Sequence, residues 1–145
     1  MTVPFVHPTT DALHELVKVY RRGLAARGHD FVGREVLGKF HIYVSDSFER
    51  GMREAVPFMK NYTDLHRAAD PERRLTEHDI GSDMARGFII VGDPERCSDT
   101  IRRWHEEGGI TTFSGTFHFG GMPQEMALKN IRLFAERVMP TLMHL

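Results

Sequence analysis

The sequence predicts an α/β domain with parallel strands, and three observations support this. Apolar residues recur at helical spacing in some stretches and alternate with a period of two in others. Two of the alternating stretches indicate clear strands, roughly Leu37 to Ser45 and Ile110 to Phe119. Strands that alternate with helices pair in parallel through right-handed crossovers. A length of 145 residues fits one domain, so 1–145 is predicted to fold as a single unit.

The first helix is predicted to begin at Thr10 or Asp11, since either side chain can cap it. Gly28 follows it, where a left-handed residue commonly ends a helix. The spacing of its apolar residues predicts a buried stripe made of Leu13, Leu16, Val17, Tyr20 and Leu24.

The first clear strand leads into a second helix. Asp46 and Glu49 have the spacing of a capping box, which predicts that Asp46 caps this helix. Pro57 falls inside it and predicts a kink. In the strand itself, Phe40, Ile42 and Val44 alternate with His41, Tyr43 and Ser45.

The middle of the chain is less regular. Asp70 to His78 is charged and predicts a loop, with a short helix near Asp79 to Arg86. Gly87 to Val91 is an apolar run that fits either a short third strand or an extended entry into the next helix. Asp93 followed by Pro94 predicts that helix, because Asp caps well and Pro suits the first helical position.

The second clear strand precedes the last helix. Gly120 and Gly121 break the strand, Pro123 opens the helix and Pro140 stops it. The alternation predicts that Phe113, Phe117 and Phe119 share one face of the strand, whereas Thr112, Ser114, Thr116 and His118 share the other.

Composition excludes several classes of function. The formal net charge of -1 lacks the basic footprint of a nucleic-acid or anionic-membrane binder. One cysteine, Cys97, excludes an intrachain disulfide and a cysteine-rich zinc site. No apolar run is long enough to span a bilayer, and the first residues lack the pattern of a signal peptide. We therefore expect a cytoplasmic protein.

His118 is the leading candidate for chemistry. It lies at the carboxyl end of a predicted strand, where parallel α/β proteins bind ligands, and the following Gly120 and Gly121 would allow a ligand close to the backbone. The alternative is a histidine that is hydrogen-bonded at the strand end, with glycines that serve only the turn. Ser45 and Asp46 occupy the equivalent place after the first strand, although helix capping explains them fully.

Other reactive groups give weaker signals. The nine histidines include no HExxH pair and no Cys-His pair at finger spacing, so no metal site is predicted. Cys97 lies on the apolar stripe of its helix, which favours a buried, inert thiol. The glycines at 115 and 120 have the spacing of a phosphate-binding loop, but Gly121-Met122 replaces its Lys-Ser/Thr pair.

The second half of the chain resembles a known family. The residues that carry the resemblance are GFIIVGDPER from Gly87, a helix that ends in EGG, a Phe-rich strand, and FHFGGMPQEMALKNIRLFAERVMPTL from Phe117. In this order and spacing they resemble the C-terminal end of bacterial luciferase-like flavin-dependent monooxygenases. Upstream, FHIYVSDSFERGMREAVPFM resembles the penultimate strand of that family and the helix after it.

The resemblance implies a partial (β/α) barrel fragment with two clear parallel strands, a short third strand at most, and flanking helices. A whole barrel takes about 250 residues, so this chain would hold only the last part of one. The family uses reduced flavin, usually FMN and alternatively a deazaflavin, to activate dioxygen. By resemblance, the residues at the mouth near flavin or substrate would be Ser45, Asp46, His118, Gly120, Gly121 and Met122; no catalytic residue is assigned.

Three hypotheses about function remain open. The chain is the C-terminal part of a flavin monooxygenase that needs a complementary N-terminal barrel chain, with a flavin reductase as a further partner. Alternatively, it is a non-catalytic remnant that binds itself or another protein. In the third hypothesis it is a small enzyme with its site between subunits. Because two or three strands cannot close a barrel, the uncovered edges predict a homo-oligomer or a captured partner.

Overall fold

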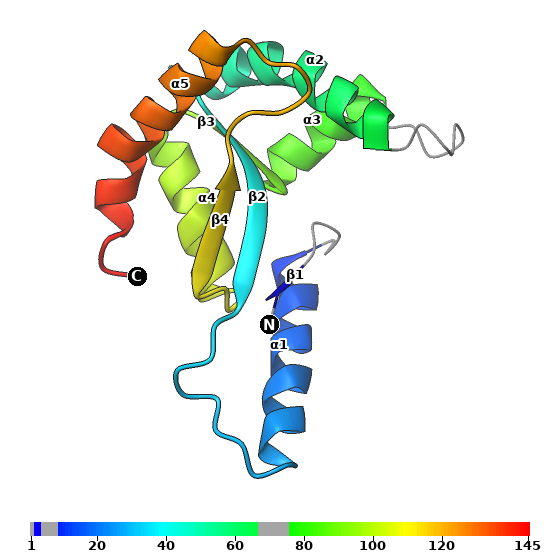
Figure 1. Ribbon diagram of the computed structural model, residues 1–145, viewed down its shortest axis with the longest axis vertical. Helices are drawn as coiled ribbons and strands as arrows, with labels where there is room; N and C mark the ends of the chain where they lie inside the picture. The colour runs from blue at the N-terminus through cyan, green and yellow to red at the C-terminus, as the bar shows by residue number, and fades with distance from the viewer. Residues whose placement is uncertain (1, 4–8, 67–75) are drawn as a thin grey trace.

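The computed structural model describes residues 2–3, 9–66 and 76–145 of the 145-residue chain. Its helices and strands follow the predicted alternation (Figure 1). The strands are β1 (Thr2–Val3), β2 (Leu37–Val44), β3 (Ile89–Gly92) and β4 (Thr112–Thr116). The helices are α1 (Thr10–Ala25), α2 (Phe48–His66), α3 (Glu77–Arg86), α4 (Pro94–Glu106) and α5 (Gln124–Leu133); a π-helical turn (Phe134–Val138) and a 3-10 turn (Met139–Leu142) extend α5.

Strand β2 is the centre of a fully parallel sheet. Leu37 pairs with both β1 and β4, and His41 pairs with both β3 and β4. A strand has only two edges, so β1 and β3 lie on one edge of β2 and β4 lies on the other. The predicted parallel pairing is confirmed, and the apolar run from Gly87 forms the third strand.

The strand order places helices on both faces of the sheet. The chain moves from β2 to β3 in one direction, and α4 then carries it back past β2 to β4. Since crossovers in parallel sheets are right-handed, this reversal puts the two sets of helices on opposite faces. Ile42 of β2 packs against α4, whereas Tyr43 packs against α2 and α3.

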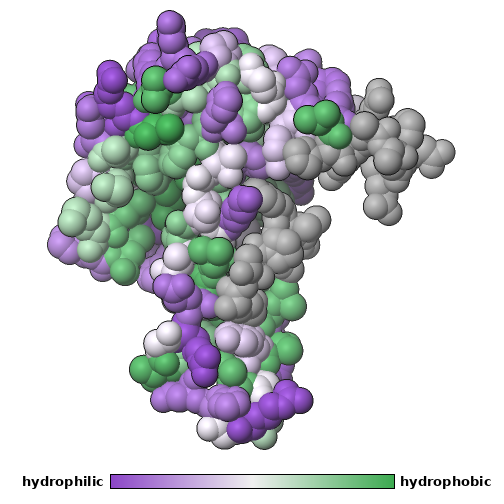
Figure 2. All heavy atoms as spheres, in the orientation of Figure 1, coloured by the Kyte–Doolittle hydropathy of each residue, from purple (hydrophilic) through white to green (hydrophobic). Residues whose placement is uncertain are grey.

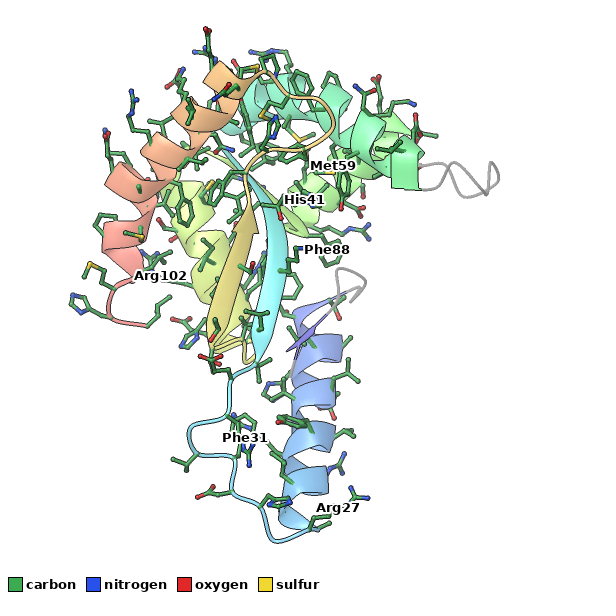
Figure 3. All side chains as sticks on the ribbon, in the orientation of Figure 1. Arg27, Phe31, His41, Met59, Phe88 and Arg102 are labelled. Carbon is green, nitrogen blue, oxygen red and sulfur yellow. The ribbon has the colours of Figure 1, made fainter. Side chains whose placement is uncertain are left out.

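Two hydrophobic clusters therefore flank the sheet. The first lies on the α4 face and joins Ile42 and Val44 to Trp104 and to Leu13 of α1. The second lies on the α2 and α3 face, where Met59 is buried. Figure 3 shows His41 of β2 next to the helix that carries Met59. His41 is only 4% exposed, and its ring lies edge-on to those of Tyr62 and Phe119.

The chain itself covers part of the sheet face opposite Phe113 and Phe117. Helices α2 and α3 bury its carboxyl-terminal half, including Tyr43. The prediction that Phe119 shares a face with Phe113 and Phe117 is wrong. Phe119 lies beyond the end of β4 at Thr116, and the chain turns there, so Phe119 joins the second cluster while Phe113 and Phe117 pack against the first.

Helix α1 and the loop after it form an arm that extends away from the sheet (Figure 1). Leu13 and Val17 anchor the arm in the first cluster, but Leu16 of the predicted stripe is exposed. Near the tip, the Arg21 guanidinium lies 4.2 Å from the ring centroid of Phe31, and Figure 3 shows Phe31 far from the sheet. The start of this helix is capped by Thr9, one residue before the prediction.

The predicted starts of α3 and α4 agree with the structure to within two residues, whereas Pro140, predicted to stop the last helix, lies inside the 3-10 turn. Asp93 caps α4 and Pro94 is its first residue, as expected. Helix α2 continues through Pro57 to His66. The predicted loop from Asp70 to His78 lies mostly outside the described residues, and α3 begins at Glu77 behind a capping box made by Thr76 and Asp79.

Candidate functional site

The candidate site lies where β2 and β4 end. Both strands run in the same direction, so their carboxyl ends meet at one edge of the sheet. Helix α2 crosses this edge, and the loop after β4 passes over it (Figure 1). The predicted site residues come from the two loops that leave these strand ends.

Ser45 is buried and held by two hydrogen bonds. It is 6% exposed, its backbone N–H donates to the carbonyl of Gly92 at 2.8 Å, and its hydroxyl donates to Oε2 of Glu54 at 3.2 Å. Asp46 is exposed and forms an ion pair with Arg50. The predicted cap is wrong by one residue, because the Ser47 hydroxyl, not Asp46, accepts the N–H of Arg50 at the start of α2.

Glu54 organises this end of the sheet. Its Oε2 accepts the hydroxyl of Tyr43 at 3.0 Å, and its Oε1 accepts Nε of Arg50 at 2.7 Å. Burial acts to raise the pKa of Glu54, but the hydrogen bonds from Arg50, Tyr43 and Ser45 outweigh it and lower the pKa. Burial and the bond to Glu54 raise the pKa of Tyr43. The phenol therefore stays protonated and acts only as a donor here.

His118 lies in the loop after β4, two residues past the strand end. Its side chain is exposed, and Nε2 lies 2.7 Å from the carbonyl oxygen of Met122. A carbonyl oxygen only accepts, so this bond requires the tautomer with hydrogen on Nε2. His118 thus closes its own turn through one ring nitrogen.

The two glycines of this loop have different surroundings. Gly120 has a φ of +60°, and a Cβ atom there would lie 1.6 Å from the carbonyl oxygen of Phe58 on α2. Asn61 of α2 donates to the carbonyl of Gly120 at 3.3 Å. Gly121 has a φ of +77° with nothing within 4 Å of the Cβ position. Gly120 therefore lets the loop approach α2, whereas Gly121 serves the turn.

The structure brings both loops onto one helix. Ser45 meets α2 at Glu54, and Gly120 meets it at Phe58, one helical turn further on. Within this group, Ser45 and Gly120 are covered by contacts of the chain itself, and Met122 is 2% exposed in the second cluster. Asp46, His118 and Gly121 are the candidates that reach the surface.

Sequence reasoning missed Asn130. This residue of α5 is 1% exposed, and its Oδ1 accepts the N–H of Val44 at 2.8 Å. Its Nδ2 donates to the carbonyls of Ile42 at 2.7 Å and Phe117 at 3.2 Å. The side chain thus continues the pairing of β2 beyond the end of β4. A polar residue beside the apolar stripe of a helix was the available signal.

Cys97 has the surroundings expected of an inert thiol. It is 0% exposed, and Sγ lies 3.6 Å from the carbonyl oxygen of Gly92. Burial, aided by the nearby Asp93 carboxylate, raises the pKa of the thiol to about 12. The thiol is therefore protonated at neutral pH and is no nucleophile.

An open depression of about 610 Å³ adjoins this end of the sheet, between the first turns of α2 and α4. The Arg96 guanidinium lies over the ring of Phe48 there, 3.9 Å from its centroid. Arg103 donates to the carbonyl of Arg86 at the end of α3, at 2.9 Å. The arginines of this depression thus join α4 to its neighbouring helices.

Comparisons with known proteins identify the relatives of this fold. No protein-family model matches the chain. The alkanal monooxygenase alpha chain of Photobacterium leiognathi is 23% identical over an alignment 171 positions long, gaps included, which spans 98% of this chain and 46% of that protein. The chain therefore spans less than half the length of this curated relative.

Solved structures give the same picture. The monooxygenase RslO1 from Streptomyces bottropensis superposes with a TM-score of 0.73 and 20% identity, covering 97% of this chain and 40% of RslO1. The oxygenating constituent of 3,6-diketocamphane monooxygenase from Pseudomonas putida, in complex with FMN, superposes with a TM-score of 0.64 and 16% identity. It is covered over 41% of its length, against 92% of this chain.

A third solved structure broadens the set. Riboflavin lyase RcaE, with modified FMN and riboflavin, superposes with a TM-score of 0.58 and 19% identity over 95% of this chain and 37% of RcaE. Each of these structures is covered only in part, as expected for a barrel fragment. The predicted resemblance is confirmed: the chain has the fold of part of a luciferase-like flavin-dependent monooxygenase.

Proposed function

We propose that the chain is the C-terminal part of a luciferase-like flavin-dependent monooxygenase that acts on a small organic substrate with dioxygen. The observation that carries this proposal is the superposition of 97% of the chain on 40% of the monooxygenase RslO1. The match to an alkanal monooxygenase alpha chain over 98% of this chain supports the same class of reaction.

The cofactor proposed for this activity is reduced FMN, with a deazaflavin as the alternative. Two of the similar structures contain FMN or modified FMN. Bound flavin would supply the electrons that activate dioxygen. The described residues fit one side of such a site, because His118, Gly121 and Asp46 reach the surface at the strand ends. At Gly120, α2 occupies the space beside the backbone.

Each candidate has a distinct expected contribution. His118 holds a proton on Nε2 through Met122, so its Nδ1 is the ring atom left to accept from a ligand. Gly121 offers backbone without a side chain above it. Glu54 fixes the rim through Ser45 and Tyr43 and is a positioning residue rather than a catalytic one.

We infer that a second polypeptide completes the site. A flavin ring needs an apolar slot that encloses most of its surface. Among the described residues, β4 pairs with β2 along one edge, and no strand pairs with its other edge. The chain also spans only about two fifths of RslO1. A complementary N-terminal barrel chain would supply the absent walls, and a flavin reductase would supply the reduced cofactor.

One observation favours the alternative of a non-catalytic remnant. The polar groups of Ser45, the backbone of Gly120 and Nε2 of His118 are each engaged by partners within the chain. A loop that satisfies its own groups in this way needs no ligand to stay ordered. The remnant would then act through protein contacts alone.

Reconstitution separates the two functions. The full chain would be mixed with an N-terminal barrel fragment of a luciferase-like monooxygenase and supplied with FMN, a flavin reductase and a reduced nicotinamide as electron donor. Visible absorbance of the complex after removal of free flavin measures bound flavin, and dioxygen consumption is compared with that of the reductase and FMN alone. The monooxygenase proposal expects flavin bound to the complex and a rate of dioxygen consumption that differs from that of the reductase and FMN alone. A complex that forms without binding flavin would support the remnant and contradict the enzyme.

His118→Gln tests the site within that experiment. Glutamine keeps a donor for the Met122 carbonyl but cannot change protonation, so the free energy of unfolding should move by less than about 1 kcal/mol. Turnover of the reconstituted enzyme should fall at least about tenfold, or about 1.4 kcal/mol of barrier. A large loss of stability with unchanged turnover would show that His118 serves the fold.

A further inference from the structure

Charge is distributed unevenly along the chain. Residues 18–34 contain five Lys or Arg and one Asp, which give a net charge of +4. Because the whole chain has a net charge of -1, the remaining residues together carry -5. The net charge of the whole chain therefore conceals a basic segment. This segment, residues 18–34, is the outer part of the arm formed by α1 and the loop after it, and we call it the arm tip (Figure 1).

The basic side chains of the arm tip reach solvent. All five are exposed, namely Lys18, Arg21, Arg22, Arg27 and Arg34. Lys18 forms an ion pair with Glu15. By contrast, the side chains of Arg27 and Arg34 form no ion pair with any other residue that the structure describes. Their guanidinium groups are therefore available to an external anion.

The loop of the arm tip is a defined turn that presents Val32. The N–H of Arg34 donates to the carbonyl of Phe31 at 3.0 Å. The N–H of Val32 donates to Oδ1 of Asp30 at 3.0 Å. The Phe31 ring lies edge-on to that of Tyr20, with 5.9 Å between their centroids, and this contact holds the turn against α1. Val32 remains 82% exposed, more than any other large hydrophobic residue among those described.

Apolar and basic side chains thus share the arm tip. Val19, next to Lys18 on α1, is 55% exposed. Figure 2 shows hydrophilic and hydrophobic atoms side by side at the far end of the arm. This combination suits an anionic membrane, because basic groups attract acidic lipid headgroups while apolar side chains enter the boundary beneath them.

A nucleic acid fits the same surface less well. Single-stranded nucleic acids stack their bases on open aromatic faces. In the arm tip, Phe31 instead packs against Tyr20 and lies 4.2 Å from the Arg21 guanidinium. The exposed Val32 would gain nothing from a phosphate backbone. The surface chemistry therefore favours lipid over nucleic acid.

The position of the arm also suits contact with a flat surface. The arm precedes β2 and so leaves the sheet at the amino end of this strand, whereas the candidate site lies at its carboxyl end (Figure 1). Beyond Val17, the last α1 residue in the first cluster, the helix continues to Ala25, a length of about 12 Å. This length exceeds the Debye length of about 8 Å at physiological ionic strength. Screening therefore weakens the repulsion between an anionic surface and the acidic remainder of the chain.

We propose that the arm tip docks onto an anionic phospholipid membrane. Arg27 and Arg34 meet the acidic headgroups, and Val32 enters the boundary beneath them. The carboxyl ends of β2 and β4 then lie at the end of the sheet away from the lipid. The proposal concerns the amino end of the sheet and does not depend on flavin chemistry.

Sedimentation of the full chain with sucrose-loaded vesicles tests this docking. One set of vesicles contains phosphatidylcholine alone, and the other adds about 30% phosphatidylserine. The chain should bind the vesicles with phosphatidylserine, and its partition coefficient should fall at least about tenfold as salt rises from about 0.1 M to about 0.5 M. Equal binding to both sets of vesicles, or binding to neither, would overturn the proposal.

A double charge variant tests the arm tip itself. Arg27→Gln combined with Arg34→Gln should lower the partition coefficient on vesicles with phosphatidylserine at least about tenfold. The matched control combines Arg53→Gln with Arg132→Gln, which removes the same charge from exposed residues outside the arm. That control should change the coefficient less than about twofold. Equal losses would mean that vesicles respond to the net charge of the chain, and the arm tip would not be the docking site.

Val32→Ser separates lipid from other polyanions. It should lower the partition coefficient on vesicles with phosphatidylserine at least about threefold, because an apolar contact is lost. Any weak binding of a single-stranded oligonucleotide, measured by fluorescence anisotropy, should not change. Leu65→Ser is the matched control, since Leu65 is 75% exposed outside the arm, and it should alter neither measurement. If Val32→Ser binds vesicles as well as the unchanged chain does, the arm tip is a site for polyanions in general and the lipid proposal is wrong.

Discussion

At the scale of single residues, the buried Asn130 side chain decides how the end of β2 is held. Its three hydrogen bonds reach the backbone of Val44, Ile42 and Phe117, and the side chain is 1% exposed. Removing it leaves buried backbone groups without partners, each at a cost of about 1 to 3 kcal/mol. Asn130 therefore has a larger effect on stability than any exposed polar residue of the site.

Asn130→Ala should lower the free energy of unfolding by about 3 kcal/mol or more, measured by urea denaturation. Asn61→Ala is the matched control, since the exposed Asn61 makes one bond of 3.3 Å to Gly120. That variant should lose less than about 1 kcal/mol. Equal losses from both variants would contradict the role assigned to Asn130.

Glu54 should make the stability of the protein depend on pH. Its pKa is lowered in the folded chain from an ordinary value of 4.5, because the bonds from Arg50, Tyr43 and Ser45 outweigh burial. A lowered pKa contributes stability above the unfolded value, and this is lost as the pH falls through the folded value. Glu54→Gln should therefore flatten the loss of stability below about pH 4.5, measured by denaturation at a series of pH values.

The exposed pair of Asp99 and Arg102 provides the control for Glu54. Asp99 has a side chain that is 63% exposed, and exposed pairs contribute little. Asp99→Asn should leave the acid limb of the stability profile unchanged. If Glu54→Gln gives the same dependence of unfolding free energy on pH as the unchanged protein, the charge of Glu54 does not contribute to stability.

At the scale of elements, the loop from β4 to α5 is fixed by its contact with α2. Gly120 combines a left-handed φ of +60° with a Cβ position 1.6 Å from the Phe58 carbonyl oxygen. Gly121 shares the left-handed backbone, at a φ of +77°, but has open space around it. Substitutions at Gly121 and Gly120 therefore distinguish the free-energy cost of a left-handed backbone from that of a steric clash with Phe58.

Gly121→Ala should lose about 1 to 2 kcal/mol, the usual penalty of left-handed backbone for a residue with a Cβ. Gly120→Ala should lose clearly more, because the methyl group also displaces α2 from the loop. Thermal unfolding of both variants measures the difference. Equal losses would mean that the loop moves away from Phe58 at no cost.

The elements that could be predicted from the sequence are those with local signals. Strand β2 and the start of α4 at Asp93-Pro94 follow from alternation and capping within a few residues. The burial of His41 and the turn of Phe119 into the second cluster depend on α2, which comes from elsewhere in the chain. The alternation of residues along a strand shows which side chains share a face, but it does not show which helices will cover that face.

The candidate site divides in the same way. The strand ends could be located because parallel strands share a direction, and this placed Ser45 and His118 at one edge. The closure of Gly120 by Phe58 and the bond of His118 to Met122 required the path of the loop. Asn130 was missed because its hydrogen bonds join residues more than eighty positions apart in sequence.

At the scale of the whole molecule, the open sheet limits what the chain binds alone. Strand β4 has a partner on one edge only among the described residues, and the depression beside α2 and α4 is open. No described helix is long and apolar enough to cross a membrane.

FMN should bind the isolated chain weakly, with a dissociation constant above roughly 10 μM, or less than about 7 kcal/mol of binding. Phosphate needs converging N–H groups or basic side chains. Helix α5 begins at this end of the sheet without a side-chain cap, but Pro123 lacks an N–H and Glu125 adds a negative charge to the first turn. The ring system would meet one wall, formed by the loops around His118 and Ser45, and no facing wall.

Flavin-fluorescence titration measures this constant, first with the chain alone and then with an added N-terminal barrel fragment. Because the fragment supplies the facing wall, it should tighten binding at least about tenfold, equivalent to about 1.4 kcal/mol. His118→Gln should weaken binding only in the completed site, since the chain alone encloses too little of the ring for one contact to matter. Tight, stoichiometric binding by the chain alone would contradict the incomplete site and would instead favour a flavin site shared between two copies of this chain.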